Sequence, residues 1–277
     1  MTKISCIIVS YNNGIFLKES IFSVINQTKA VDEIIIADDG STDGSRDLIA
    51  SLAREYPQIK PIFREKNLGV TLNRDLAIRD ATSHLITTLD GDDWYSPQKI
   101  EREYLAIKNN PEAIAYSDVN LADMDGKVTR DLDLSNFASF DIKQRLNWII
   151  YHVTEIPRDM LLPKKLYLEV GGLRHNLDKY EDWELKIRIA AYPNPWIHSG
   201  IPGVNYRATD SGLSKINPII HAKYQYQILF LNYDSLKYNI GKTGFWLAMA
   251  KVTQRGLKSL FGIRSKLKKI GFIAVDS

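Results

Sequence analysis

Residues 85–93 read LITTLDGDD, an apolar, β-rich run followed at once by three carboxylates within four residues. Clustered acids repel one another unless a cation, hydrogen-bond donors or bulk water offsets their charge. Hard divalent cations prefer such oxygen ligands. The stretch therefore predicts a buried strand that ends in a metal-binding loop containing Asp90, Asp92 and Asp93. An exposed, aspartate-rich turn is the alternative.

The sequence around this stretch alternates between apolar β-rich runs and helix-like segments. This alternation is typical of a parallel sheet covered by helices on both faces, so it predicts an α/β fold. Strands are expected at 4–10, 33–37, 59–64, 84–89 and 113–118, and helices at 16–25, 45–55, 70–80 and 97–108. Asp125-Gly126 predicts a hairpin turn, and turn chemistry explains the acids at Asp123 and Asp125.

Polar residues follow each of the first four predicted strands. In sheets of this kind, ligands bind beyond the carboxyl ends of the strands, so these loops are expected to form one polar rim. A tyrosine there can stack on a flat base, and an aspartate can accept a hydrogen bond from an imide N–H. Each loop taken alone is equally an ordinary turn or helix cap. The loops are SYNN (10–13), DDGSTD (38–43), KNLG (66–69) and DGDD (90–93).

The composition of the 277-residue chain, with 44% hydrophobic and 25% charged residues, is close to the average of soluble globular proteins. It favours one large domain with an appendage. The single cysteine, Cys6, lies in an apolar run, so we expect a buried, unreactive thiol rather than a disulfide. No signal peptide and no long apolar run is recognised, which predicts a cytoplasmic setting.

The charge of the chain is unevenly distributed, although its formal net value is only +3. Residues 242–269 contain eight Lys and Arg residues and no acid, interleaved with aromatic and aliphatic residues. Two interpretations stay open for the stretch 242–277: a packed helix with a solvated basic face, or peripheral contact with the anionic inner face of the plasma membrane. Nucleic acid is not an expected partner, because no recognition motif accompanies the charge.

The motifs, taken in order, resemble the family 2 glycosyltransferases with the GT-A fold, over roughly residues 3–214. The resemblance implies a Rossmann-like, mixed but mainly parallel sheet with helices on both faces. It divides the chain into a glycosyltransferase domain (1–214, with a nucleotide-sugar half at 1–118 and an acceptor half at 119–214) and a helical, basic, amphipathic tail (215–277). The motifs are CIIVSYN (6–12), DDGSTD (38–43), NLG (67–69) with Arg74, LDGDD (89–93), GGL (171–173) and EDWEL (181–185) with Arg188.

The resemblance also implies roles for residues at matching positions. Asp92 would be the main protein ligand of Mn²⁺ or Mg²⁺ on the donor diphosphate, with Asp90 and Asp93 as weaker candidates. Arg207 would belong to a mobile loop over the phosphates, unless it forms a plain surface ion pair. Asp75 stands where Asn is frequent in the family, which leaves the contacts of that helix open. The residues expected to bind the nucleotide sugar are Ser10, Tyr11, Asn12, Asp39, Asn67, Gly69, Arg74, Asp90, Gly91, Asp92 and Arg207.

A second acidic site begins a predicted amphipathic helix at Glu181-Asp182. By resemblance Asp182 is the catalytic base, and the chemistry needs one, because an acceptor hydroxyl must lose its proton as it attacks. The alternative is that both carboxylates only favour a helix N-terminus electrostatically. Glu181, His152 and Trp183 are weaker candidates for contacts with the acceptor, and packing in the core is the alternative for these aromatic residues.

Together these implications describe a metal-dependent, inverting hexosyltransferase. It would move a sugar from a nucleoside diphosphate sugar, with UDP favoured, to a hydroxyl of a saccharide or lipid-linked acceptor in the synthesis of a bacterial surface polysaccharide or glycolipid. A sugar nucleotidyltransferase is an alternative, but its Gly-rich, basic early loop is missing from residues 10–14. A non-catalytic sugar-nucleotide-binding protein is another, and the presence of both the metal and the base motifs argues against it.

Overall fold

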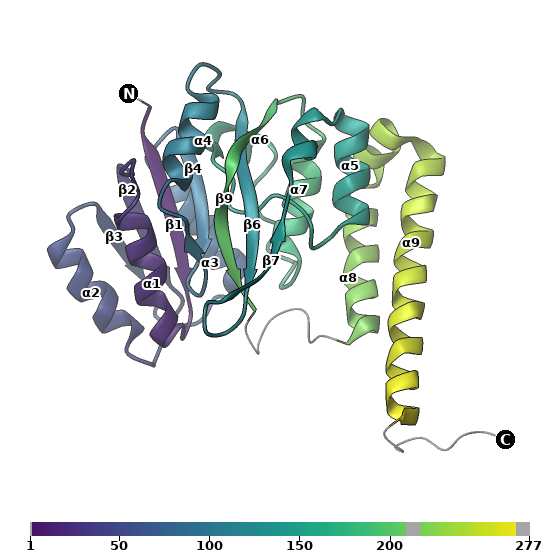
Figure 1. Ribbon diagram of the computed structural model, residues 1–277, viewed down its shortest axis with the longest axis horizontal. Helices are drawn as coiled ribbons and strands as arrows, with labels where there is room; N and C mark the ends of the chain where they lie inside the picture. The colour runs from purple at the N-terminus through teal and green to yellow at the C-terminus, as the bar shows by residue number, and fades with distance from the viewer. Residues whose placement is uncertain (1, 209–216, 270–277) are drawn as a thin grey trace.

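The computed structural model describes residues 2–208 and 217–269 and contains two sheets (Figure 1). The first sheet has five strands, of which β8 alone is antiparallel to its neighbour. The predicted α/β fold with a mainly parallel sheet is confirmed. In spatial order the strands are β3 (Ile59–Phe63), β2 (Glu33–Asp38), β1 (Ile4–Ser10), β4 (Leu85–Asp90) and β8 (Leu162–Pro163).

The central strands are mainly hydrophobic because helices cover both faces of the sheet. Every residue of β1 and β2 is buried. The buried residues include Cys6, and burial raises the pKa of its thiol to about 12, so it stays protonated and unreactive at neutral pH, as predicted.

The order of the strands creates a switch point between β1 and β4. The chain runs outward from β1 through β2 to β3 and then returns past β1 to β4. Right-handed crossovers therefore place α1 (Gly14–Ile25) and α2 (Ser45–Glu55) on one face and α3 (Val70–Asp80) on the other (Figure 1). A crevice is expected where the direction reverses, beyond the carboxyl ends of β1 and β4.

The second sheet continues directly from the acidic loop after β4. Its strands, in spatial order, are β5 (Trp94–Tyr95), β9 (Trp196–Arg207), β6 (Ile114–Ala122) and β7 (Val128–Leu132). Residues 90–93 therefore join the two sheets. The turn between β6 and β7 is built as predicted, since the Asp123 carboxylate accepts hydrogen bonds from the backbone N–H groups of Asp125 and Lys127.

Of the remaining helices, α5, α7, α8 and α9 form the other end of the molecule, away from β3 and α2, whereas α4 packs on the second sheet (Figure 1). Helix α5 packs on α7 and α9, and α8 packs on α9. Helix α9 bends at Gly241, whose φ of 78° interrupts the helical conformation. These elements are α4 (Lys99–Ile107), a 3-10 turn (Ser135–Ser139), α5 (Ile142–Tyr151), α6 (Lys164–Glu169), α7 (Glu181–Ala190), α8 (Pro218–Leu231) and α9 (Tyr233–Lys269).

Candidate active site

A cavity of about 220 Å³ opens at the switch point between β1 and β4. The strand register explains its position, because Ser10 lies beside Asp38 and Val9 lies beside Asp90. Seven of the residues expected to bind a nucleotide sugar line it: Ser10, Tyr11, Asp39, Asn67, Asp90, Gly91 and Asp92. Asn13, which was expected on the polar rim without a binding role, also lines the cavity. Sequence reasoning missed Val9, Val70 and Asn73, although each lies within or next to a motif that it had identified.

The β1 side of this cavity offers both a ring and unsatisfied polar atoms. Tyr11 is 50% exposed at the rim. The hydroxyl of Ser10 is buried, and no described residue forms a hydrogen bond with it. One carboxylate oxygen of Asp38, beside it at the end of β2, is also buried without a partner among the described residues, although Asp38 does not line the cavity. Buried polar atoms of this kind need a partner from a ligand or water. Gly91 must lack a side chain, since a Cβ there would lie 2.7 Å from the Asn13 side-chain oxygen.

The second wall is held together by Asp39, whose carboxylate is 3% exposed. It accepts hydrogen bonds from the backbone N–H groups of Leu68 (2.8 Å) and Gly69 (2.9 Å). Burial raises the pKa of Asp39 above its usual range. Asn12 ties the two loops together in a similar way, because its side-chain oxygen accepts from the Thr42 N–H at 2.8 Å. Asn12 and Gly69 shape the cavity without lining it.

Arg74 connects this cavity to the second acidic site. The guanidinium is buried and donates to Asp90 on one side and, at 2.9 Å, to Glu181 on the other. Burial opposes its charge, but the two carboxylates raise the pKa of Arg74 further above its usual range. The loop after β4 and the start of α7 are therefore parts of one network, although they lie about ninety residues apart in the chain.

Asp92 has the electrostatic character of a cation ligand. Burial and then the neighbouring charge of Asp90 raise its pKa to about 6. No hydrogen bond from another residue in the described parts of the chain reaches its carboxylate, and it faces the cavity. A divalent ion would offset this unfavourable charge. Mg²⁺ commonly binds through one or two carboxylates completed by substrate phosphates, and this donor set fits that pattern.

The protein alone does not form a complete metal cage in residues 2–208 and 217–269. No group of three or more His, Cys, Asp or Glu side chains there is arranged to hold an ion. Asp93, a weaker candidate, is 3% exposed, and its carboxylate accepts a hydrogen bond at 2.8 Å from the backbone N–H of Arg207. Burial and the charges of Asp90 and Asp92 raise the pKa of Asp93. This contact fixes the acidic loop to the end of β9.

The placement of Arg207 corrects an expectation from the sequence. The residue ends β9 and is 4% exposed, rather than lying on a mobile loop. Its guanidinium donates to the carbonyl oxygens of Asp92 (3.0 Å) and Met124 (2.8 Å) and to Glu19, and it lies 4.5 Å from the centre of the Trp94 ring. Its donors are thus used by protein groups. Through its contacts with Asp92 and Asp93, Arg207 fixes the acidic loop to the end of β9.

Asp182 lies in the first turn of α7 with its side chain 37% exposed. Its carboxylate accepts a hydrogen bond at 2.7 Å from Lys186, one turn further along the helix. Burial favours the protonated form, but Lys186 and then Arg158 outweigh it and hold the pKa of Asp182 well below its usual range. The group is therefore ionised at neutral pH. The spacing of four residues between Asp182 and Lys186 predicts an ion pair on one face of a helix, but sequence reasoning did not use it.

The three candidate acceptor residues are placed differently from one another. Glu181 is 7% exposed and bound to Arg74. Trp183 is 1% exposed and donates to the Ile149 carbonyl oxygen at 2.9 Å, so core packing is its role, and the expected sugar contact is corrected. The ring of His152 stacks on Trp148 with 3.9 Å between ring centres.

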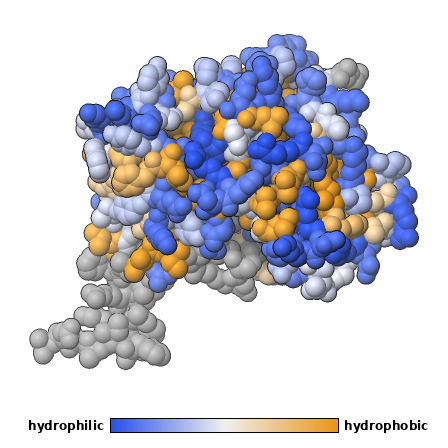
Figure 2. All heavy atoms as spheres, turned by 180° about the vertical axis from the view of Figure 1, so that it is seen from behind, coloured by the Kyte–Doolittle hydropathy of each residue, from blue (hydrophilic) through white to orange (hydrophobic). Residues whose placement is uncertain are grey.

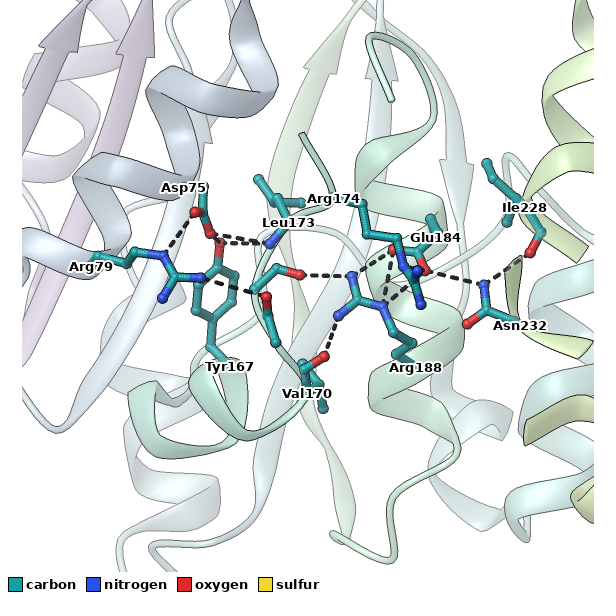
Figure 3. Close-up of polar contacts among 12 residues, drawn as sticks. Asp75, Arg79, Tyr167, Val170, Leu173, Arg174, Glu184, Arg188, Ile228 and Asn232 are labelled. Carbon is teal, nitrogen blue, oxygen red and sulfur yellow. Dashed lines mark hydrogen bonds and ion pairs between the residues drawn. The ribbon is translucent and has the colours of Figure 1, made fainter. Parts of the chain in front are cut away.

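Two ion networks connect α3 to α7 through the loop at residues 170–173 (Figure 3). Asp75 accepts hydrogen bonds from Arg79 (2.8 Å), the hydroxyl of Tyr167 (2.5 Å) and the backbone N–H of Leu173 (3.1 Å). Burial opposes its charge, but these donors lower the pKa of Asp75. Asp75, which stands where the family frequently has Asn, thus anchors the loop around Gly172 that leads to α7.

The second network is centred on Glu184, which is completely buried on α7 (Figure 3). Its carboxylate accepts from Arg174 (2.8 Å), Arg188 (2.9 Å) and Asn232 (3.1 Å). Arg188 also donates to the carbonyl oxygen of Gly172 at 2.7 Å. Because Asn232 lies between α8 and α9, the C-terminal helices contact the helix that carries Asp182.

A larger cavity of about 400 Å³ lies elsewhere, around the C-terminal end of α7 and the junction of α8 and α9. Its lining includes Arg188, Asn232 and Tyr233. None of the residues that the sequence assigned to the site lines this cavity, and it contains neither acidic cluster. The smaller cavity at the switch point is therefore the candidate active site, despite its size.

Comparison with known proteins defines the class of protein. A family model described as glycosyl transferase family 2 matches residues 5–162, more than half of the chain. The chain belongs to glycosyl transferase family 2, as its motifs predicted. The solved structure of S. aureus TarS 1-349 in complex with UDP-GlcNAc superposes with a TM-score of 0.72 at 16% identity, covering 92% of this chain and 73% of that one. This likeness confirms the predicted GT-A fold.

Two curated relatives are more similar in sequence, over less than half of the chain. The putative teichuronic acid biosynthesis glycosyltransferase TuaG of Bacillus subtilis is 29% identical over 123 residues, which cover 44% of this chain and 49% of TuaG. The cholesterol galactosyltransferase of Borreliella burgdorferi is 36% identical over 115 residues, which cover 42% of this chain and 32% of that protein. The matches thus span a half or less of these relatives.

Proposed function

We propose that this protein is a metal-dependent, inverting glycosyltransferase that uses a nucleoside diphosphate sugar, UDP-linked in particular. The observation that carries the proposal is the Arg74 bridge, which joins the Asp90 end of the donor cavity to Glu181, the neighbour of Asp182. A cation-binding group and an ionised carboxylate then belong to one site. Membership of glycosyl transferase family 2 and the likeness to a structure solved with UDP-GlcNAc support it.

The chemistry is a single displacement at the anomeric carbon. The acceptor hydroxyl oxygen forms a bond to that carbon, the bond from the carbon to the diphosphate oxygen breaks, and the hydroxyl proton passes to the Asp182 carboxylate. A bound Mg²⁺ or Mn²⁺, held by Asp92 with Asp90 nearby, would neutralise the charge that develops on the diphosphate. In this proposal Tyr11 and Asp39, which line the cavity, contact the base, and Arg74 keeps the two halves of the site aligned.

Screening tests the donor and the metal together. The purified protein is incubated with a panel of nucleoside diphosphate sugars in Mn²⁺, and release of nucleoside diphosphate is measured with and without EDTA. We expect the protein to release UDP from a UDP-sugar. EDTA should abolish this release, and added Mn²⁺ should restore it. Thermal stabilisation by UDP-sugars without any turnover, in the presence of saccharide and lipid acceptors, would instead indicate a binding protein.

A saccharide or lipid-linked acceptor is the second part of the proposal, with the C-terminal helix in contact with an anionic membrane. Within the described residues no helix is both long and apolar enough to cross a bilayer. On α9, however, Trp246, Leu247 and Leu257 are at least half exposed, and Lys242 and Lys251 are exposed beside them. Figure 2 shows hydrophobic side chains on the side of the molecule where α8 and α9 lie. An apolar strip flanked by lysines suits the surface of an anionic bilayer.

Vesicle flotation tests the membrane contact. We expect the protein to float with vesicles containing phosphatidylglycerol and not with pure phosphatidylcholine vesicles. The double variant Trp246→Ser, Leu247→Ser should lose this binding, because it removes the exposed apolar strip. A matched control, Leu105→Ser, changes a 45% exposed leucine on α4 and should bind normally. Equal flotation of the double variant would contradict this contact.

A further inference from the structure

Arg158 lies in the loop between α5 and β8, a region without a recognisable motif. The next residue, Asp159, fixes this loop to β4: its carboxylate accepts from the Thr88 hydroxyl at 3.0 Å, and its carbonyl oxygen accepts from the Thr87 hydroxyl at 2.7 Å. Asp159 also has a left-handed backbone, with a φ of 45°. Such a conformation persists only where surrounding contacts hold it. Arg158 is thereby held beside the strand that ends at Asp90.

The guanidinium of Arg158 is held on its other side by an aromatic ring. It lies 4.0 Å from the ring centre of Tyr206, within the range of a cation–π contact. Tyr206 is in β9, directly before the Arg207 whose N–H binds Asp93. Arg158 therefore sits between the end of β4 and the end of β9, beside the acidic loop that joins the two sheets.

The hydrogen-bonding groups of Arg158 are unused within residues 2–208 and 217–269. No described residue accepts a hydrogen bond from it, and its Nε is buried without a partner. Among the neighbouring cations, Arg74 binds Asp90 and Glu181, Lys186 binds Asp182, and Arg207 binds Glu19. One nitrogen each of Arg74 and Arg64 is also buried without a partner, but both of these side chains form other hydrogen bonds, whereas Arg158 forms none with the described residues. A buried guanidinium N–H without an acceptor is costly, so this arrangement calls for an anionic oxygen from outside the protein.

The surrounding charges keep Arg158 cationic without occupying its donors. Burial opposes the charge, but Asp182, Tyr206 and Asp93 together raise its pKa above the usual range. The contact with Tyr206 and the attachment of Asp159 to β4 place the guanidinium beside the acidic loop, and Asp182 is close enough to act on its charge. That is the region between the attacking hydroxyl and the departing diphosphate in the reaction proposed above.

We propose that Arg158 binds the terminal phosphate of the donor diphosphate, the role that the sequence had suggested for Arg207. This inference rests on the proposed function. Two parallel N–H groups of a guanidinium match two phosphate oxygens. As the bond between the anomeric carbon and the phosphate oxygen breaks, its electron pair stays on that oxygen, and the hydrogen bonds from Arg158 strengthen. Arg158 loses no proton in the step.

Titration calorimetry in Mn²⁺ with UDP and UMP tests this assignment, because UMP lacks only the terminal phosphate. Removing a charge-assisted hydrogen bond costs roughly a factor of ten or more in affinity. We expect Arg158→Gln to weaken UDP binding by about that factor while UMP binding stays within about twofold of the wild type. Arg158→Lys should recover part of the loss. Arg130→Gln, which changes an exposed arginine on β7, is the matched control and should bind both nucleotides normally.

Two outcomes would overturn the assignment. Unchanged UDP affinity in Arg158→Gln would exclude the contact with the donor, and a raised KM for the acceptor alone would then assign Arg158 to an anionic group of the acceptor. Equal losses for UDP and UMP would indicate a merely structural role. If the wild-type protein itself fails to bind UDP, the proposed function fails rather than this inference. Thermal melting of each variant confirms that it is folded.

Discussion

At the scale of single residues, the candidate site contains a carboxylate, Asp92, whose ionised form is destabilised by its surroundings. Asp92 is a carboxylate with no neighbouring donor, and its pKa is raised to about 6 by burial and by Asp90. A raised pKa in the folded state means that the ionised form is less stable there than in the unfolded chain. The contribution of Asp92 to stability is therefore favourable below about pH 4 and is lost as the pH rises through 6.

Asp92→Asn should accordingly stabilise the metal-free protein at neutral pH while harming its ligand binding. A pKa difference of about two units corresponds to about 1–3 kcal/mol. We expect a higher melting temperature for the variant at pH 7.5, no difference near pH 4, and a smaller gain from Mn²⁺ with UDP than in the wild type. Asp80→Asn, an exposed change on α3, is the control. A variant that melts lower than the wild type at pH 7.5 would contradict the account.

At the scale of elements, the loop that leads to α7 depends on Gly172. Its φ is +68°, and a Cβ there would lie 2.5 Å from an Asp75 carboxylate oxygen and 2.6 Å from Arg79. Gly172→Ala should therefore destabilise the protein by more than the roughly 1–2 kcal/mol expected from a left-handed alanine alone. Gly44→Ala separates the two effects, because Gly44 has a φ of +90° and a methyl group added there would meet nothing within 4 Å.

Denaturant unfolding measures both glycine variants. We expect the loss of unfolding free energy to be clearly larger for Gly172→Ala than for Gly44→Ala, with a fall in turnover for the first alone because α7 carries Asp182. Equal losses would show that Asp75 and Arg79 move aside at little cost. In that case the Asp75 network does not position the loop.

The elements themselves were predictable because their signals are local. Apolar β-rich runs gave β1 to β4, and the polar loops at their ends gave seven of the residues lining the cavity. The roles of Arg207, Trp183 and Arg158 were not predictable in this way. Each depends on partners far along the chain: Arg207 binds Glu19, 188 residues away, and Trp183 donates to Ile149. No spacing rule reports such contacts.

At the scale of the whole molecule, the C-terminal helices are part of the structure around the site. Asn232 binds the buried Glu184 of α7, and Tyr224 of α8 donates to Asp178, shortly before α7 begins. Arg255 of α9 donates to the Ile150 carbonyl oxygen at the end of α5 at 3.1 Å. If α9 contacts a membrane as proposed above, these contacts would hold α7, with Asp182, close to that surface.

The central claim is that Asp182 removes the proton of the acceptor hydroxyl, while Asp92, with Asp90 nearby, holds the metal ion on the donor diphosphate. The most direct measurement compares Asp182→Asn with the wild type, taking UDP affinity by calorimetry in Mn²⁺ and single-turnover transfer from a UDP-sugar that the wild type uses. The account predicts UDP affinity within about threefold and transfer slowed by roughly 10²-fold or more, the usual contribution of a general base. Transfer by Asp182→Asn at the wild-type rate would contradict it.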